Sequence, residues 1–372
     1  MTARDSSATL ELVASQGVTR GPATREPHAT AGHGYHPTPA ACEGTILEVQ
    51  NLRVEFKTAE NRVCVVEDVS FTIEKGETVA LVGESGSGKS VTSLAIMGLL
   101  QRPPAVVSGE IRFRDAAGKQ WEFLELSDNE MRMFRGDRVS MIFQEPMTSL
   151  NPVHTVGDQI SEALLIHRNM PKAQRRQAAI RMLARVGIPE PEKRSVAYPH
   201  ELSGGMRQRV MIAMALACEP SLLIADEPTT ALDVTIQAQI LNDLKTLQSE
   251  FGMAMLFVTH DLGVVAEVAH SVVVMYAGQV VESGPTEEIL KNPRHPYTRA
   301  LLASIPRANA DRKQPLTAIP GTVPDVQHTP SGCRFHPRCR FAEEGRCNTH
   351  EPAVETLDDG RMVRCLRWRE LQ

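Results

Sequence analysis

The stretch TVALVGESGSGKSVTSLAIMGLL (78–100) joins an apolar run to a glycine-rich loop and then to a segment with helical spacing. TVALVG (78–83) is apolar without interruption, which is typical of a strand buried on both faces. VTSLAIMGLL (91–100) carries its apolar residues at the spacing of a helix. A buried strand, a loop of small residues and a helix in this order predict an α/β fold.

The loop has the chemistry of a phosphate cradle, because it fits the pattern G-x-x-x-x-G-K-[ST]. Its glycines let successive backbone N–H groups approach phosphate oxygens, and the helix that follows favours anions at its N-terminus. Lys89 supplies a charge to the outer phosphates, and Ser90 is placed to hold Mg2+. A glycine-rich turn without a ligand is disfavoured by the complete spacing. The residues expected at the nucleotide are Gly83, Glu84, Ser85, Gly86, Ser87, Gly88, Lys89, Ser90 and Val91.

A second buried strand, in SLLIADEP (221–228), ends in two carboxylates. Open α/β sheets place ligands at the carboxyl ends of their strands. Asp226 is therefore expected to reach the Mg2+ shell through water, and Glu227 to orient or deprotonate the water that attacks the γ-phosphate. A solvated acidic turn is the alternative, which the upstream phosphate loop makes the weaker interpretation.

The stretch LSGGMRQRV (202–210) predicts a second anion-binding helix start, with Ser203 and two glycines ahead of a helical segment. One nucleotide needs only one such cradle. The second is therefore expected to serve a nucleotide held by a partner subunit.

These motifs together resemble those of ABC transporter ATP-binding subunits, over about residues 45–285. The matching positions, in chain order, are the Walker A loop at Gly83–Ser90, Gln144 as the Q-loop glutamine, the LSGGM signature at Leu202–Met206, Walker B at Leu222–Asp226 with Glu227, the D-loop at Ala231–Asp233, and His260 as the switch histidine.

The resemblance implies two subunits that face head to tail. Ser203, Gly204 and Gly205 of one would close over the ATP held by Lys89 of the other. It also implies that Gln144, an Mg2+ ligand, and His260 act in catalysis beside Glu227, with Asp233 near the nucleotide. Phe56 is the best match for the ring that stacks on adenine, although a purely structural role at the end of its strand is equally plausible.

The expected fold is a P-loop ABC ATPase core with an antiparallel β subdomain, a helical subdomain at about 145–215 and a small cysteine-rich C-terminal extension. Strands at 46–56 and 63–73 would form the β subdomain. Two helices at 155–187, the second starting near Pro171 and ending near Gly187, belong to the helical subdomain. In the resembling family this subdomain receives the membrane subunit.

Three domains are expected along the 372 residues: a disordered extension at 1–43, the nucleotide-binding domain at 44–285 and the extension at 286–372. A net charge of −5 disfavours nucleic acid as a partner. The apolar run 210–218 is nine residues long, too short for a membrane span, and we expect no secretory signal. We therefore expect the protein on the cytoplasmic face of the inner membrane, held by its partners.

Two stretches narrow the resemblance to one group within this family. QEPMTSLNP (144–152) and HPYTRALLASIP (295–306) resemble the corresponding stretches of peptide and nickel importers. The resemblance implies import of di- or oligopeptides through two permease subunits, with an extracytoplasmic binding protein and a second ATPase subunit. Nickel or another small solute such as glutathione is the alternative cargo. A soluble ABC ATPase of DNA repair or translation is disfavoured, because the chain has neither a long coiled-coil insertion nor a second ATPase half.

Four of the seven cysteines gather in the extension, namely Cys333, Cys339, Cys347 and Cys365. Disulfides are rare in a cytoplasmic ATPase, so the cluster indicates metal ligation. Four thiolates suit an iron–sulfur cluster or Zn2+. Because C-x-x-C pairs are missing and some resembling ATPases carry a [4Fe-4S] cluster in this region, the cluster is favoured over Zn2+ and over free thiols. His336 and His350 leave mixed ligation open.

Overall fold

The computed structural model describes residues 44–59, 61–144, 149–230, 232–305 and 318–371. The expected disordered extension at 1–43, the four residues 145–148 after Gln144, and Ala231 lie outside the described residues. None of the described helices is long and apolar enough to cross a membrane.

An eight-stranded sheet positions the phosphate loop. Its strand order is β11-β12-β10-β9-β3-β8-β7-β6, and the pairs from β9 through β6 are parallel. Every residue of β3, β7 and β8 is buried, which explains why their sequences are apolar except at one end. The strands are β3 (Thr78–Val82), β6 (Val139–Ile142), β7 (Leu222–Asp226), β8 (Ala254–Thr259), β9 (Ser271–Tyr276), β10 (Gln279–Pro285), β11 (Glu355–Thr356) and β12 (Met362–Val363).

A second, antiparallel sheet has the order β2-β1-β4-β5. Its strands are β1 (Thr45–Lys57), β2 (Arg62–Glu74), β4 (Ala105–Arg114) and β5 (Gln120–Glu122). β1 pairs with both β2 and β4, and buried residues from this sheet join α1 and strands of the first sheet in one apolar core. The two antiparallel strands expected at 46–56 and 63–73 are therefore confirmed.

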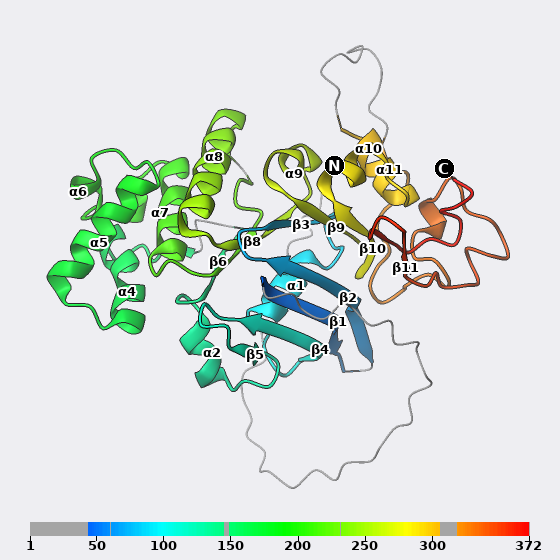
Figure 1. Ribbon diagram of the computed structural model, residues 1–372, viewed down its shortest axis with the longest axis horizontal. Helices are drawn as coiled ribbons and strands as arrows, with labels where there is room; N and C mark the ends of the chain where they lie inside the picture. Colours follow the sequence, from blue (N-terminus) through cyan, green and yellow to red (C-terminus); the bar gives the residue numbers. More distant parts are fainter. Residues whose placement is uncertain (1–43, 60, 145–148, 231, 306–317, 372) are drawn as a thin grey trace, which may run out of the picture. The chain divides into compact units, whose positions relative to one another are not determined.

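The helices gather mainly toward the β6 end of the large sheet, where α4, α5, α6 and α7 lie together (Figure 1). α4 and α5 pack on each other and on α7, and their apolar residues share a core with β6, β7, β8 and α8. The helices are α1 (Lys89–Ile96), α2 (Asp128–Phe134), α4 (Val156–Arg168), α5 (Lys172–Arg185), α6 (Pro191–Arg194), α7 (Gly204–Leu216), α8 (Val234–Phe251), α9 (Leu262–Val268), α10 (Thr286–Lys291) and α11 (Pro296–Ala303), with 3-10 turns η1 (Pro199–Glu201) and η2 (His336–Arg338).

The helix after the phosphate loop is shorter than expected. The sequence predicted helix over 91–100, whereas α1 starts at Lys89 and ends at Ile96. Gly98 has a φ of +62°, the left-handed conformation that commonly follows the end of a helix. The glycine therefore stops α1 before the last apolar residues. The two helices expected at 155–187 are confirmed as α4 and α5, and Gly187, at φ +72°, follows the second.

The C-terminal segment is built onto the opposite end of the large sheet from β6. β12 pairs with β10 through Glu282–Val363 and Ser283–Met362 and continues the sheet to β11. Buried Tyr297 and Phe335 share an apolar core with residues of β3 and β9. The extension therefore packs against the strand that carries the phosphate loop.

Candidate functional site

The loop between β3 and α1 has the backbone conformation of an anion-binding loop. Gly86 and Gly88 have φ values of +80° and +100°, in the region that glycine adopts without strain. Lys89 is 5% exposed and donates to the carbonyl oxygens of Gly83 at 2.7 Å and Glu84 at 3.0 Å. Burial lowers the pKa of Lys89, although the neighbouring carboxylates oppose this change.

Two further features of the loop suit a bound phosphate. A Cβ at Gly83 would lie 2.2 Å from the carbonyl oxygen of Met275, so only glycine fits beside β9. Ser87 is 1% exposed, and its hydroxyl has no hydrogen-bond partner among the described residues. A buried polar atom without a partner is rare in a folded protein, and here it is part of the predicted phosphate cradle.

Glu227 is the residue on which the predicted catalytic side chains converge. His260 Nδ1 lies 3.0 Å from Glu227 Oε1, while Gln144 Nε2 and Thr230 Oγ1 donate to Oε2 at 3.1 Å and 2.9 Å. Gln144 follows β6, Glu227 and Thr230 follow β7, and His260 follows β8. They meet because these three strands are parallel neighbours, so their carboxyl ends lie at the same edge of the sheet. The structure thus brings together Glu227, Gln144 and His260, which lie far apart in the sequence.

The environment keeps Glu227 ionised. Burial alone raises the pKa of this carboxyl, but hydrogen bonds with His260 and Thr230 and the charges of His260 and Lys89 outweigh burial and hold the pKa below its ordinary value. A carboxylate that is ionised and held by several donors is suited to orient a water molecule or accept its proton.

Asp226 and Ser90 form the contact expected at an Mg2+ site. Ser90 Oγ donates to Asp226 Oδ1 at 3.3 Å, which links the start of α1 to the end of β7. Burial raises the pKa of Asp226, and the charge of Glu227 adds to this effect. A cation beside these oxygens would offset that unfavourable charge.

Other predicted site residues lie away from this group. Ser203 caps α7 by accepting from Met206 N at 3.3 Å, and Asp233 caps α8 by accepting from Ile236 N at 3.0 Å. Among the described residues no hydrogen bond joins Ser203, Gly204 or Gly205 to the phosphate loop, and α7 lies with the helical group rather than beside α1 (Figure 1). Phe56 is partly buried and packs on the core of the antiparallel sheet.

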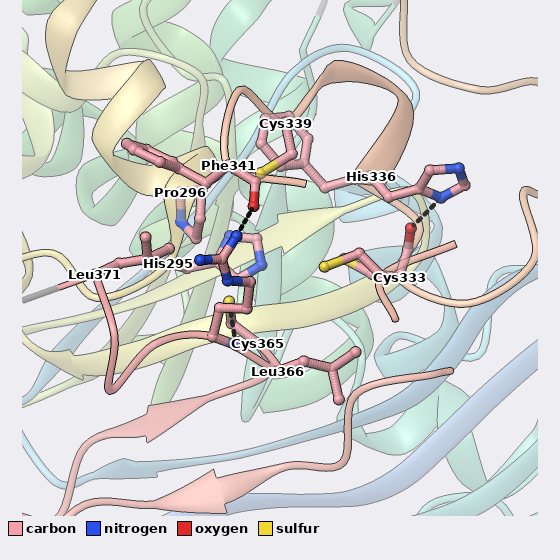
Figure 2. A pocket seen from close by; sticks show the side chains of 12 residues that line it. His295, Pro296, Cys333, His336, Cys339, Phe341, Cys365, Leu366 and Leu371 are labelled. Carbon is pink, nitrogen blue, oxygen red and sulfur yellow. Dashed lines mark hydrogen bonds between the residues drawn. The ribbon is translucent and has the colours of Figure 1, made fainter. Parts of the chain in front are cut away.

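The four clustered cysteines line one cavity of about 20 Å3 in the C-terminal segment. Figure 2 shows the sulfur atoms of Cys333, Cys339 and Cys365 turned toward the same space. Burial raises the pKa of Cys333 to about 12 and that of Cys365 to about 11. The described cysteines are all free thiols, and within the described ranges no group of three or more His, Cys, Asp or Glu side chains is arranged to hold a metal ion.

The structure also reveals site residues that the sequence did not indicate. Thr230 is a third donor to Glu227, and its position three residues after Glu227, in the turn that follows β7, is the signal that was available. Tyr297 and Arg338 contact Glu84 in the phosphate loop from more than 200 residues away in the chain. No local pattern predicts such distant contacts.

Comparison with known families gives two matches. Residues 66–230 match the model described as ABC transporter, and residues 281–347 match the one described as oligopeptide/dipeptide transporter, C-terminal region. The first match covers the loop, Gln144, the LSGGM stretch and Glu227. The second covers Tyr297, Arg338 and three of the four clustered cysteines.

Similar proteins extend over most of the chain. A putative peptide import ATP-binding protein of Brucella abortus is 54% identical, covering 88% of this chain and 98% of its own length. The oligopeptide transport ATP-binding protein AppD of Bacillus subtilis is 51% identical over 88% of this chain and 98% of its own. The dipeptide transport ATP-binding protein DppD of Escherichia coli is 51% identical over 86% and 96%.

Among solved structures, a dimeric ATP-binding cassette in a post-hydrolysis state with ADP and Pi has a TM-score of 0.57 and 29% identity. It covers 65% of this chain, and the match includes 99% of its own chain. A protein of Clostridium perfringens, described as part of an ABC transporter complex, has a TM-score of 0.55 and 28% identity, covering 67% of this chain and 92% of its own.

Proposed function

Because the chain belongs to the family of ATP-binding subunits of ABC transporters, we propose that it hydrolyses ATP to drive import of di- or oligopeptides through separate permease subunits. The observation that carries the ATPase assignment is the convergence of Gln144, Thr230 and His260 on Glu227, beside the Ser90–Asp226 pair. These contacts give one carboxylate the partners that a water-activating base needs.

We assign the triphosphate to the loop at 83–90 with Val91. Backbone N–H groups of the loop and Lys89 would hold the phosphates, and the unpartnered Ser87 hydroxyl is available to them. Ser90 and Gln144 would ligate Mg2+, with Asp226 in its outer shell; the oxygen donors suit this ion. When bound, Mg2+ supplies positive charge that offsets the charge of the phosphates. Phe56 remains our candidate for stacking on adenine.

Glu227 would orient or deprotonate the attacking water, with its carboxylate held ionised by His260 and Thr230. His260 has 61% of its side chain exposed, so it is free to contact the γ-phosphate while Nδ1 faces Glu227. Gln144, two residues after the end of β6, would contact the same phosphate.

The active site is proposed to be completed by a second ATPase subunit. Ser203, Gly204 and Gly205 would close over the nucleotide of the partner, with Asp233 nearby. Supporting this, Ser203 and Gly204 are exposed, and a structural neighbour at 29% identity is described as dimeric. ATP bound between two subunits would then hold them together.

Peptide cargo is proposed from the names of the relatives and from the C-terminal match. Two membrane permeases and an extracytoplasmic binding protein would be the other components, with this chain at the cytoplasmic membrane face. Nickel or glutathione is the alternative cargo. A non-transport ATPase is the weaker candidate, since the relatives are named for transport.

For the cysteine pocket we propose metal ligation by Cys333, Cys339, Cys347 and Cys365, with a [4Fe-4S] cluster as the first choice and Zn2+ as the alternative. The donor set fits both. The present cavity of about 20 Å3 has room for little more than one water molecule, so binding a cluster requires this cavity to widen. All four cysteines lie on loops, where such shifts are least costly. When bound, the metal centre would cross-link these loops.

The ATPase assignment is tested with two variants of the purified protein. We expect Glu227→Gln to bind ATP but to lose turnover by about 100-fold or more, because its amide cannot accept the proton. In size-exclusion chromatography this variant should form a dimer with ATP and remain monomeric with ADP. Lys89→Ala should lose ATP affinity in a fluorescent nucleotide titration. Wild-type hydrolysis by Glu227→Gln would contradict the assigned base.

The metal site is tested by anaerobic purification followed by iron, sulfide and zinc analysis. Four iron and four sulfide per chain are expected, whereas one zinc per chain in a colourless protein would favour the alternative. Cys347→Ser should lower the metal content, while Cys218→Ser, a buried thiol outside the pocket, serves as the control. A preparation without stoichiometric metal would contradict both assignments.

Cargo is tested by uptake of labelled dipeptide into vesicles that contain the two permeases, the binding protein and this ATPase. ATP-dependent uptake that is lost with Glu227→Gln would support the peptide assignment. Uptake of nickel in place of peptide would favour the alternative.

A further inference from the structure

The C-terminal extension contacts the phosphate loop through an ion pair between Arg338 and Glu84. Both terminal nitrogen atoms of Arg338 contact the Glu84 carboxylate, Nη1 to Oε2 at 2.7 Å and Nη2 to Oε1 at 3.0 Å. The Arg338 side chain is 5% exposed and Glu84 29% exposed, so the pair is largely shielded from water. Paired hydrogen bonds between guanidinium and carboxylate are among the strongest and most directional polar contacts in proteins.

Other contacts hold Arg338 in place. Its Nε donates to the carbonyl oxygen of Pro320 at 2.8 Å, and Nη1 also lies 3.4 Å from the hydroxyl of Tyr276. Because Arg338 closes the turn η2 immediately before Cys339, one short segment connects the loop to the cysteine cavity.

A second contact reaches the same residue of the loop. The backbone N–H of Glu84 donates to the hydroxyl oxygen of Tyr297 at 2.9 Å. Tyr297 is fully buried, and its ring packs on Tyr276 and Phe335 with centroid separations of 4.6 Å and 5.3 Å. The phenol is therefore fixed by a rigid aromatic cluster, and it fixes the Glu84 amide in turn.

The backbone held in this way is the backbone that positions Lys89. The Lys89 ammonium group donates to the carbonyl oxygens of Gly83 and Glu84, on either side of the amide that Tyr297 holds. Rotation of the peptide between Gly83 and Glu84 would move one of these acceptors. Arg338 and Tyr297 thus act on the phosphate-binding lysine through Glu84.

We propose that Arg338 and Tyr297 are positioning residues for ATP binding, holding the phosphate loop in the conformation that receives the triphosphate. This inference rests on the proposed ATPase function and adds the C-terminal extension to its machinery. A loop that is already ordered binds its ligand more tightly, because less conformational freedom is lost on binding.

The experiment compares Arg338→Met, Tyr297→Phe and Glu84→Gln with wild type in the full-length protein. Affinity for Mg-ATP is measured by fluorescent nucleotide titration, KM and kcat by phosphate release, and folding by the thermal unfolding midpoint. We expect Arg338→Met and Glu84→Gln to weaken ATP binding by about tenfold, and Tyr297→Phe by about threefold. In Arg338→Met and Tyr297→Phe, turnover at saturating ATP should change by less than about twofold, because the groups around Glu227 are untouched.

The matched control is Arg361→Met. Arg361 is an equally buried arginine of the same extension, with 3% of its side chain exposed, and it contacts Asp359 and the carbonyl oxygen of Asn292 instead of the loop. This variant should lower the unfolding midpoint without changing ATP affinity. Arg338→Lys, which restores one charged donor, should recover part of the lost affinity.

The outcomes separate the two proposals. If wild type fails to bind ATP, the proposed function is wrong. If wild type binds ATP and folded Arg338→Met and Tyr297→Phe bind it equally well, the positioning role is wrong. Should Arg338→Met fail to fold, Tyr297→Phe and Glu84→Gln decide, because each removes a loop contact with little change in side-chain volume. The double variant Arg338→Met/Glu84→Gln should bind no more weakly than either single variant if the pair acts as one unit.

Discussion

The backbone of Glu227 has a conformation that residues other than glycine rarely adopt. Its φ is +47°, in the left-handed region where residues with a Cβ are uncommon. The amide nevertheless donates to Val258 O at 2.9 Å, so the neighbouring strand β8 supports the conformation. Strained residues cluster at functional sites, and this one turns a carboxylate at a strand end toward Gln144 and His260.

Asp115 is a buried carboxylate that organises the turn between β4 and β5 and holds Arg138. Its oxygens accept from the backbone N–H groups of Ala117 and Lys119, from the Trp121 indole and from Arg138, which directly precedes β6. Burial raises the pKa of Asp115, but these hydrogen bonds outweigh burial and lower it. Asp115 thus ties the residue before β6 to the turn between β4 and β5.

We expect Asp115→Asn to lower the free energy of unfolding by about 2 kcal/mol at pH 7, because an amide NH2 would face donors that the carboxylate now satisfies. A folded-state pKa below the unfolded one adds stability that is present above the unfolded pKa and lost as pH falls through the folded one. The difference between wild type and variant should therefore stay constant from pH 7 to 5 and shrink below about pH 4.

Urea denaturation followed by tryptophan fluorescence measures this difference. If the difference in unfolding free energy between wild type and Asp115→Asn already shrinks between pH 7 and 5, the lowered pKa of Asp115 is contradicted.

Helix α7 begins with two glycines, and packing within this chain accounts for only one of them. A Cβ at Gly205 would lie 3.1 Å from Ile236, whereas a Cβ at Gly204 would meet nothing within 4 Å. Gly204 has no positive φ that would require glycine. Its identity is therefore unexplained within this chain and fits close approach of a partner's nucleotide.

Gly204→Ala should separate stability from activity. Alanine reduces the freedom of the unfolded chain, so we expect the variant to be more stable by about 0.5–1 kcal/mol. If the partner's phosphates approach this helix start, the added methyl group should lower ATP turnover by about tenfold or more. Thermal unfolding and phosphate release measure the two quantities. Unchanged turnover would remove Gly204 from the partner's nucleotide site.

The elements that the sequence predicted best are those whose own residues determine them. β3 and β7 are apolar except for one terminal residue each, Ser203 caps α7, and Gly187 follows α5. The end of α1 was missed because Gly98 sits inside an apolar pattern that otherwise continues as a helix. The contacts of Arg338 and Tyr297 with Glu84 were not predicted, because they depend on how the extension packs on β3 and β9. No local sequence pattern encodes that packing.

For the molecule as a whole, the phosphate loop and the LSGGM stretch lie in different parts of one chain. The loop follows β3 in the centre of the large sheet, and the LSGGM stretch opens α7 in the helical group beyond β6 (Figure 1). The family resemblance predicted a shared nucleotide between subunits, and the separation of these two cradles is consistent with that proposal.

The extension is also part of the sheet that it flanks. Truncation after residue 305 would remove β12 from β10 and take Phe335 away from the core that includes Tyr297. We expect the truncated protein to unfold at a lower temperature and, when folded, to bind ATP more weakly. Thermal unfolding and nucleotide titration test both effects. Full stability of the truncated chain would show that the core does not depend on the extension.

The pairing of β12 with β10 has a consequence for solubility. Without β12, the backbone donors and acceptors of β10 would form an open sheet edge next to the apolar Val280 and Val281. An edge of this kind is a template for strands of other molecules, and natural proteins keep such edges covered. The short C-terminal hairpin thus protects the ATPase core against self-association, which light scattering of the truncated protein would detect as aggregates.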